Sequence, residues 1–245
     1  FVWWERRAAD PLLDMGLFRD RGAAAACAVN ALVGFALALA ITNVPLFVNT
    51  RLLLFDAADP DVLRRAAWDA GWILSALTLT MAAAAWPGGM LAGRIGDRGA
   101  MAAGLALALL GYGLMSRWAP DTPYGPMVAH LALAGAGLGL VIAPAADAVI
   151  GAAPPDRRGA VSAIVIALRL VGMTVGVAAL TLWGVQRQDA LLRAGAADPL
   201  VTADPPAFLM GIAARVIGET FLFGAAALAL ALLIVALTRG RGRRA

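Results

Sequence analysis

Long apolar stretches alternate along the chain with short charged segments. Five stretches carry no charged residue, 22–50, 70–93, 99–116, 122–146 and 220–238, and a sixth, 159–186, carries one, Arg169. A helix needs roughly 20 apolar residues to cross the hydrocarbon core of a bilayer. Backbone groups in lipid must be satisfied within their own segment, so these stretches should be helical. The pattern predicts an all-α membrane protein with six transmembrane helices, at about 22–50, 70–93, 99–116, 122–146, 159–186 and 217–238.

The composition agrees with a membrane protein and narrows the chemistry. Hydrophobic residues make up 61% of the chain and charged residues 15%, whereas a soluble domain carries about 25% charged residues. The single cysteine, Cys27, excludes a disulfide within the chain. The sequence contains no nucleotide-binding loop, paired-histidine metal motif or nucleophile elbow. We therefore expect no enzyme, no cofactor and no metal site.

The first residues, FVWWERR, are typical of a helix leaving the membrane, with tryptophans at the headgroup level followed by basic residues. Residues 1–21 are interpreted as the end of a preceding span and a cytoplasmic connector. Residues 22–245 are interpreted as a six-helix bundle with a short basic tail. This division predicts that the chain is the C-terminal portion of a longer protein, with a missing N-terminal half as its partner.

Arginine supplies all twenty basic residues and predicts the orientation, because short cytoplasmic loops are enriched in positive charge. Twelve arginines fall on one side: Arg6, Arg7, Arg19, Arg21, Arg94, Arg98, Arg157, Arg158, Arg239, Arg241, Arg243 and Arg244. Seven fall on the other: Arg51, Arg64, Arg65, Arg117, Arg187, Arg193 and Arg215. The imbalance predicts a multi-pass membrane protein with a cytoplasmic C-terminus, and it explains the basic charge without any nucleic acid. The arginine-only, alanine-rich composition suggests a bacterial genome, so we expect the bacterial inner membrane.

Tryptophans near the predicted span ends support this placement, because tryptophan is enriched at membrane interfaces. Trp68, Trp72 and Trp118 fall at predicted outer ends, and Trp86 falls near an inner end. Between the spans, the predicted outer connections include a long loop from about 187 to 215. Three spans precede the outer turn at 117–121 and three follow it.

The predicted inner turn between the second and third spans has a distinctive sequence, GGMLAGRIGDR at 88–98. Its glycines and charges resemble the signature loop of the major facilitator superfamily at these positions: Gly89, Leu91, Ala92, Gly93, Arg94, Gly96 and Arg98. Asp97 departs from the pattern, which has a basic residue there. The resemblance implies a gating loop, made here of Gly89, Leu91, Gly93, Arg94, Gly96, Asp97 and Arg98. The glycines would let helix ends approach, and the arginines would meet carboxylates or helix C-terminal carbonyls. The alternative is a tight turn with ordinary positive-inside charge.

Further segments resemble the fourteen-span drug/proton antiporter branch of that superfamily. They are, in chain order, ERR at 5–7, DPLL at 10–13, LFRDR at 17–21, GAGLG at 135–139, AP at 143–144, PDRRGAVSA at 155–163 and RLVG at 169–172. The resemblance implies one six-helix half of a major-facilitator bundle, built as a 3+3 repeat. It also implies proton-coupled multidrug efflux by alternating access, with hydrophobic or cationic compounds and protons as partners besides the lipid bilayer. The alternatives are a six-span scaffold or interaction protein, or a half-transporter that dimerises.

Four polar residues are candidates for substrate binding or coupling. Arg169 lies about midway through its predicted span, where a charge is costly and usually functional. It would either face the bundle and pair with a carboxylate or snorkel towards the inner surface. Asn43 could face a cavity. Asp147 could line an inner gate or simply be solvated at a helix end. Glu219 either forms an ion pair with Arg215 four residues earlier or carries a proton.

Four glycines within the spans are candidates for helix packing, because small residues let helix backbones approach closely in lipid. Gly135 and Gly139 belong to the run GAGLG in the fourth span. Gly172 and Gly176 follow Arg169 by three and seven residues and share much of its helix face.

Overall fold

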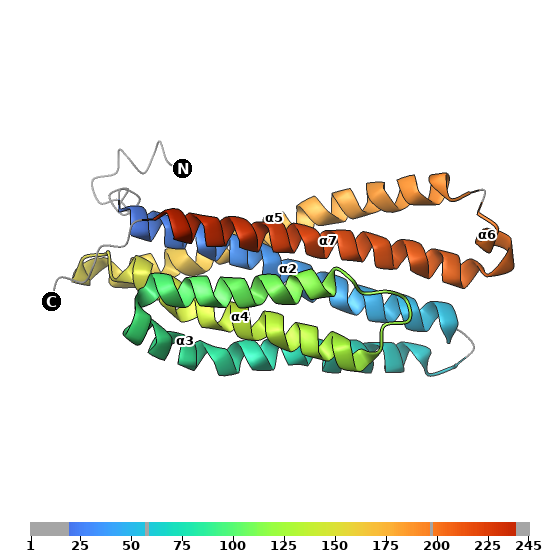
Figure 1. Ribbon diagram of the computed structural model, residues 1–245, viewed down its shortest axis with the longest axis horizontal. Helices are drawn as coiled ribbons and strands as arrows, with labels where there is room; N and C mark the ends of the chain where they lie inside the picture. The colour runs from blue at the N-terminus through green and yellow to red at the C-terminus, as the bar shows by residue number, and fades with distance from the viewer. Residues whose placement is uncertain (1–19, 57–58, 197, 239–245) are drawn as a thin grey trace.

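The computed structural model describes residues 20–56, 59–196 and 198–238, and these contain helices and no strand (Figure 1). The long helices are α2 (Arg21–Phe55), α3 (Val62–Met115), α4 (Tyr124–Ile150), α5 (Arg158–Ala194) and α7 (Pro205–Leu237). Two short elements, η2 (Pro155–Arg157) and α6 (Leu200–Ala203), lie in connections. All five long helices have the length and apolar composition to cross a bilayer. The chain is an all-α, multi-pass membrane protein. The expectations for residues 1–19 and 239–245 lie outside the described residues.

Helix α3 crosses the bundle twice because its backbone breaks at Gly96. A straight helix of 54 residues would be about 80 Å long, more than twice the hydrocarbon thickness. Gly96 has φ 79° and ψ 159°, a region that is essentially restricted to glycine. The arms 62–95 and 97–115 therefore run in opposite directions (Figure 1). Sequence analysis predicted two helices joined by a turn of several residues, whereas one residue makes the reversal.

The helices extend beyond the predicted spans at the other end of the bundle. Helix α5 continues to Ala194 and α7 begins at Pro205, so most of the predicted outer loop from 187 to 215 is helical. Good helix formers and the pair formed by Arg193 and Asp189, whose atoms Nη2 and Oδ2 lie 2.6 Å apart, favour helix in this polar segment. The first charged residue therefore marks where the apolar span ends, whereas the helix itself continues into the polar segment.

Helix α4 is wedged between the two arms of α3, and its glycines alternate between them. A Cβ atom added at Gly135 or Gly139 would overlap the carbonyl oxygen of Leu77 or Met81 on the first arm. One added at Gly137 would overlap the backbone nitrogen of Ala108 on the second arm. Residues two apart on a helix point about 200° apart. The alternating glycines therefore let α3 backbone approach α4 closely on two opposite sides.

The remaining long helices, α2, α5 and α7, pack on each other and join the α3–α4 group through α2 and α7. Gly172 on α5 lies so close to α2 that a Cβ there would overlap the carbonyl oxygen of Ala31. Gly176, one turn further on, faces Phe35. The groups in contact are therefore not the first three and last three spans, and this packing does not establish the predicted 3+3 half of a major-facilitator bundle.

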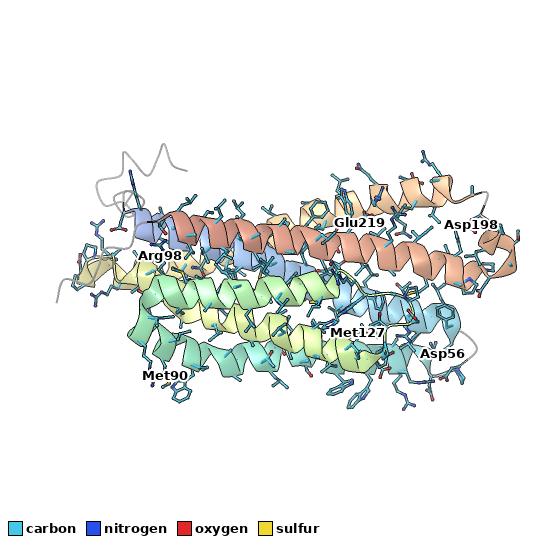
Figure 2. All side chains as sticks on the ribbon, in the orientation of Figure 1. Asp56, Met90, Arg98, Met127, Asp198 and Glu219 are labelled. Atoms are coloured by element: carbon cyan, nitrogen blue, oxygen red, sulfur yellow. The ribbon has the colours of Figure 1, made fainter. Side chains whose placement is uncertain are left out.

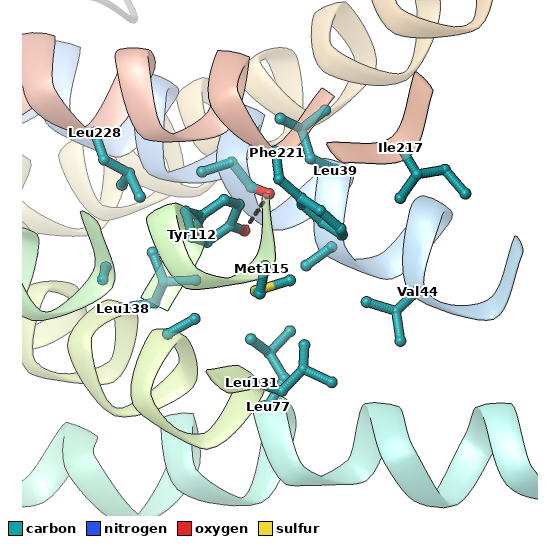
Figure 3. Packing of buried hydrophobic residues seen from close by; sticks show 14 of the residues in the cluster. Leu39, Val44, Leu77, Tyr112, Met115, Leu131, Leu138, Ile217, Phe221 and Leu228 are labelled. Carbon is teal, nitrogen blue, oxygen red and sulfur yellow. Dashed lines mark hydrogen bonds between the residues drawn. The ribbon is translucent and has the colours of Figure 1, made fainter. Parts of the chain in front are cut away.

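A hydrophobic cluster that includes Tyr112 and Phe221 joins the two groups (Figure 3). Tyr112 is fully buried, donates its hydroxyl to the carbonyl oxygen of Ala36 on α2, and packs edge-on against Phe221 of α7. Trp118 contacts Phe221 and Phe47, with ring centroids 5.4 and 5.6 Å apart. Trp118 is 4% exposed, so its expected place in an outer aromatic belt is wrong, whereas Trp68 and Trp86 are both 76% exposed. Its ring lies inside the bundle because Nε1 donates to Nδ1 of His130 on α4, at 3.1 Å.

The wedge predicts a difference between two glycine-to-alanine substitutions. Gly137→Ala should lower the free energy of unfolding by about 1–3 kcal/mol, because its Cβ would overlap the second arm of α3. Gly113→Ala is the control: no atom lies within 4 Å of an added Cβ there, and alanine should be neutral or stabilise the helix by up to about 1 kcal/mol. Thermal unfolding in detergent measures both. Equal midpoints for the two variants would contradict the wedge.

Candidate functional site

The Gly96 turn forms part of a cavity of about 1120 Å³ at one end of the bundle. Its wall combines the start of α2, the turn of α3, the end of α4 and the end of α7. The polar side chains that line it are Asp20, Arg21, Arg94, Asp97, Arg98 and Thr238. Five of the predicted gating residues, Gly93, Arg94, Gly96, Asp97 and Arg98, lie here, while Gly89 and Leu91 lie earlier on α3 and do not line the cavity.

Arg98 ties the α3 turn to the end of α7. Its Nη2 atom donates a hydrogen bond to the carbonyl oxygen of Ala236, in the last turn of α7. Figure 2 shows Arg98 near the end of the bundle at which α3 reverses. Carbonyl groups of the last turn have no partner within their own helix and carry the negative end of the helix dipole. This is the kind of contact that the sequence suggested for the turn arginines. A cation placed there stabilises the contact between α3 and α7.

Gly93 and Gly96, at the reversal itself, are not sites of close helix approach. Gly96 supplies the positive φ, and no atom lies within 4 Å of a Cβ added at Gly93 or Gly96. The close contact on the first arm of α3 involves Gly88, where a Cβ would lie 2.8 Å from the carbonyl oxygen of Leu140. Gly89, the next residue, is in ordinary contact with α4, because a Cβ there would lie 4.0 Å from that of Ala143, so close approach of helices at the predicted loop glycines stays a prediction.

A second polar site links α5 to α2 within the apolar part of the bundle. Arg169 Nη2 donates to Asn30 Oδ1 at 2.9 Å, while Asn30 donates its own amide to Ala26 of α2. The helices are close enough that a Cβ on Gly34 would overlap the carbonyl oxygen of Arg169. Gly34 and Gly172 thus bring the two backbones together, and the guanidinium reaches α2 across this contact.

Arg169 has fewer partners than its guanidinium can use. Its Nε atom is buried and makes no hydrogen bond with the described chain, and no described carboxylate lies within 4 Å of it. Asn30 is 1% exposed, so Arg169 turns towards the bundle at that contact. A neutral amide satisfies one donor of the cation but leaves its charge uncompensated.

Two other predicted residues lie outside both sites. Asn43 is buried, donates its side-chain amide to the carbonyl oxygen of Leu39 on its own helix at 3.0 Å and does not line the cavity at the Gly96 turn. Asp147 is exposed near the end of α4, where its carbonyl oxygen accepts from Gly151. Its position fits solvation of a helix end.

Glu219 forms ion pairs with two arginines, and sequence analysis had considered one of them. Its carboxylate accepts from Arg215, at 3.3 Å and four residues away, as the spacing suggested. It also accepts two bonds from Arg187 of α5, at 2.7 and 2.8 Å. Arg215 and Glu219 line a second cavity of about 350 Å³ with Trp118. Arg187 was missed because it lies 32 residues away in sequence, beyond the reach of any helical spacing rule.

No protein-family model matches the chain, but several curated proteins are similar to it. It is 35% identical over 217 residues to a triacylglyceride transporter of Mycolicibacterium hassiacum, which covers 84% of this chain. It is 33% identical over 203 residues to a triacylglyceride transporter of Mycobacterium tuberculosis, and 31% identical over 229 residues to one of Mycolicibacterium smegmatis, covering 78% and 89% of this chain. The chain spans 37–38% of the length of these relatives.

These relatives correct the family assignment made from the sequence. They are named triacylglyceride transporters, so the assignment to drug/proton antiporters of the major facilitator superfamily is wrong. The motifs behind it reflect a tight turn and glycine packing, which transporters of different substrates can share. The names support transmembrane transport in general, and they agree with the expectation that the chain is not an enzyme.

The Arg169–Asn30 contact predicts a non-additive pair of substitutions. Asn30→Leu should lower the free energy of unfolding by about 2–4 kcal/mol, because it leaves a buried cation without its acceptor. The same substitution in an Arg169→Met background should cost at least about 1 kcal/mol less.

Asn43→Leu serves as the control, because the Asn43 side chain bonds within its own helix. This substitution should lower the free energy of unfolding by the same amount in both backgrounds. Thermal unfolding in detergent of the wild type, the single variants and the double variants gives the coupling energy. A coupling energy near zero for Asn30 and Arg169 would show that the hydrogen bond contributes nothing to the α2–α5 contact.

Proposed function

We propose that the chain forms part of a membrane transporter for uncharged lipids of the triacylglyceride class. The observation that carries this proposal is the similarity, at 31–35% identity, to proteins named triacylglyceride transporters. The chemistry of the bundle supports it, because the buried polar side chains of the described residues are Asn30, Asn43 and Thr220. An interior this apolar suits a substrate dominated by acyl chains better than a hydrated cation.

Transport of a lipid by such a bundle requires a barrier that opens at each end in turn. We propose alternating access, with the Gly96 turn as the latch at one end. Arg98 holds α3 to α7 through a single side-chain bond to a backbone carbonyl, and a contact of this kind can be broken without disrupting the core. The ion pair of Glu219 with Arg187 and Arg215 would perform the corresponding task between α5 and α7, further towards the opposite end.

Arg169 would act within the transport path in this proposal. Its guanidinium is directed at Asn30 between α2 and α5, and its Nε atom is buried without a described partner. A polar link at the contact of two apolar helices favours one relative position of those helices, because moving them apart leaves the cation unpaired. The proton coupling and the partner half expected from the sequence remain predictions.

Substrate class and latch can be tested together in bacteria that produce the protein. Production should increase export of a fluorescent triacylglyceride and leave efflux of a cationic dye unchanged. Arg98→Gln should reduce triacylglyceride export at least about fivefold while the protein stays in the membrane, because it removes a charge-assisted bond to the α7 carbonyl. Collapsing the proton gradient should stop export if the predicted coupling is present.

Arg64→Gln is the matched control for Arg98→Gln. Arg64 is an exposed arginine of the same helix that bonds to Asp61, so its loss removes an equal charge and should leave export near wild type. Dye efflux without lipid export would contradict the substrate class. Normal lipid export by Arg98→Gln would contradict the latch.

We also propose that the Gly96 end faces the cytoplasm, as the arginine distribution predicts. Single cysteines placed at Arg94 and Asp121, in a Cys27→Ala background, should differ in intact cells. A membrane-impermeant maleimide should label the cysteine at 121 and spare the one at 94, and permeabilised cells should be labelled at both. The reverse pattern would invert the orientation.

A further inference from the structure

The cavity at the Gly96 end is lined by three arginines, and the proposed latch involves one of them, Arg98. Arg21, Arg94 and Arg98 line it, and Arg98 is bonded to Ala236. Arg21 and Arg94 are exposed and form no ion pair with a residue of the described chain. Two guanidinium groups on the wall of one cavity thus have donors available to an external ligand.

Neither acidic residue of the same wall, Asp20 or Asp97, forms an ion pair with Arg21 or Arg94. The carboxylate of Asp20 caps α2 and accepts from the backbone nitrogens of Gly22 and Ala23, at 2.8 and 3.2 Å. Asp97, the other acidic residue of the wall, also takes part in an interaction with another group. A ligand that satisfies Arg21 and Arg94 must therefore bring its own negative charge.

The rest of the wall is apolar and includes Ala92, Ile95, Met101, Ala102, Val235 and Ala236. A volume of about 1120 Å³ exceeds the roughly 300–1,000 Å³ typical of small-molecule sites. Arginines beside apolar side chains, between helix ends of a membrane protein, form the type of pocket that holds anionic lipid headgroups. The planar guanidinium suits phosphate oxygens in particular.

We propose that this cavity binds a phosphate group, presented by an anionic phospholipid headgroup or by a soluble phosphate compound. The ligand of this cavity differs from the transported lipid of the proposed function, because a triacylglyceride is uncharged and would leave the charge of Arg21 and Arg94 unneutralised. A phosphate between Arg21 and Arg94 would join the start of α2 to the α3 turn. It would add to the bond by which Arg98 joins that turn to α7.

The test compares two double variants that remove the same charge. Arg21→Gln with Arg94→Gln alters the cavity. Arg64→Gln with Arg193→Gln alters two arginines whose side chains are 78% and 79% exposed, neither of which lines this cavity. The probes are phosphatidylglycerol in phosphatidylcholine nanodiscs, followed by native mass spectrometry, and inorganic phosphate, followed by thermal unfolding in detergent.

Wild-type protein and the Arg64/Arg193 variant should retain phosphatidylglycerol, and the Arg21/Arg94 variant should bind it at least about tenfold more weakly. A variant with lysine at 21 and 94 should recover most of the binding, which separates charge from a packing defect. If inorganic phosphate raises the unfolding midpoint of wild type but not of the Arg21/Arg94 variant, the ligand is a soluble phosphate. Equal binding of both probes by the two double variants would overturn the proposal.

Discussion

The close approach of helix backbones at glycine is the constraint on which this bundle depends. Between helices in lipid there is little hydrophobic gain, because acyl chains are as apolar as leucine, so association relies on close packing and hydrogen bonds. Glycines supply that packing at both main contacts, Gly135, Gly137 and Gly139 between α4 and α3, and Gly34 and Gly172 between α2 and α5. At each of these positions an added Cβ would overlap backbone atoms of the facing helix.

Few polar groups lie between the helices of the described chain, and two of their bonds connect helices that are distant in sequence. Tyr112 bonds to α2 from α3, Trp118 bonds to His130 from the connection after α3, and Arg169 bonds to Asn30 from α5. A polar group in an apolar interior needs a partner, so each bond fixes the rotation of its helix as well as its distance. Tyr112 and Trp118 also meet at Phe221, which makes α7 part of the same central cluster.

The contacts at the two cavities differ from this core in being polar and partly exposed. Arg98 holds α7 through a backbone carbonyl, and Glu219 is shared by two arginines on two helices. Exposed ion pairs and single side-chain bonds contribute little stability compared with packed helix contacts, so they can change partners while the glycine contacts persist. The glycine contacts thus lie in the apolar interior, whereas the contacts that can change partners lie at the cavity walls.

The sequence by itself determined the class of structure and the approximate position of every long helix. Uncharged stretches of this length have one stable form in lipid, so each became helical, and Gly96 reversed the chain where the pattern indicated a turn. The tertiary structure decided what local patterns do not encode: that Trp118 turns inward, that Gly137 and Gly34 are contact glycines, and that Arg187 reaches Glu219. A helix that is apolar on every face gives no signal of which face meets which neighbour. That choice depends on shape complementarity and on polar partners far away in the chain, and both exist only once the helices have packed.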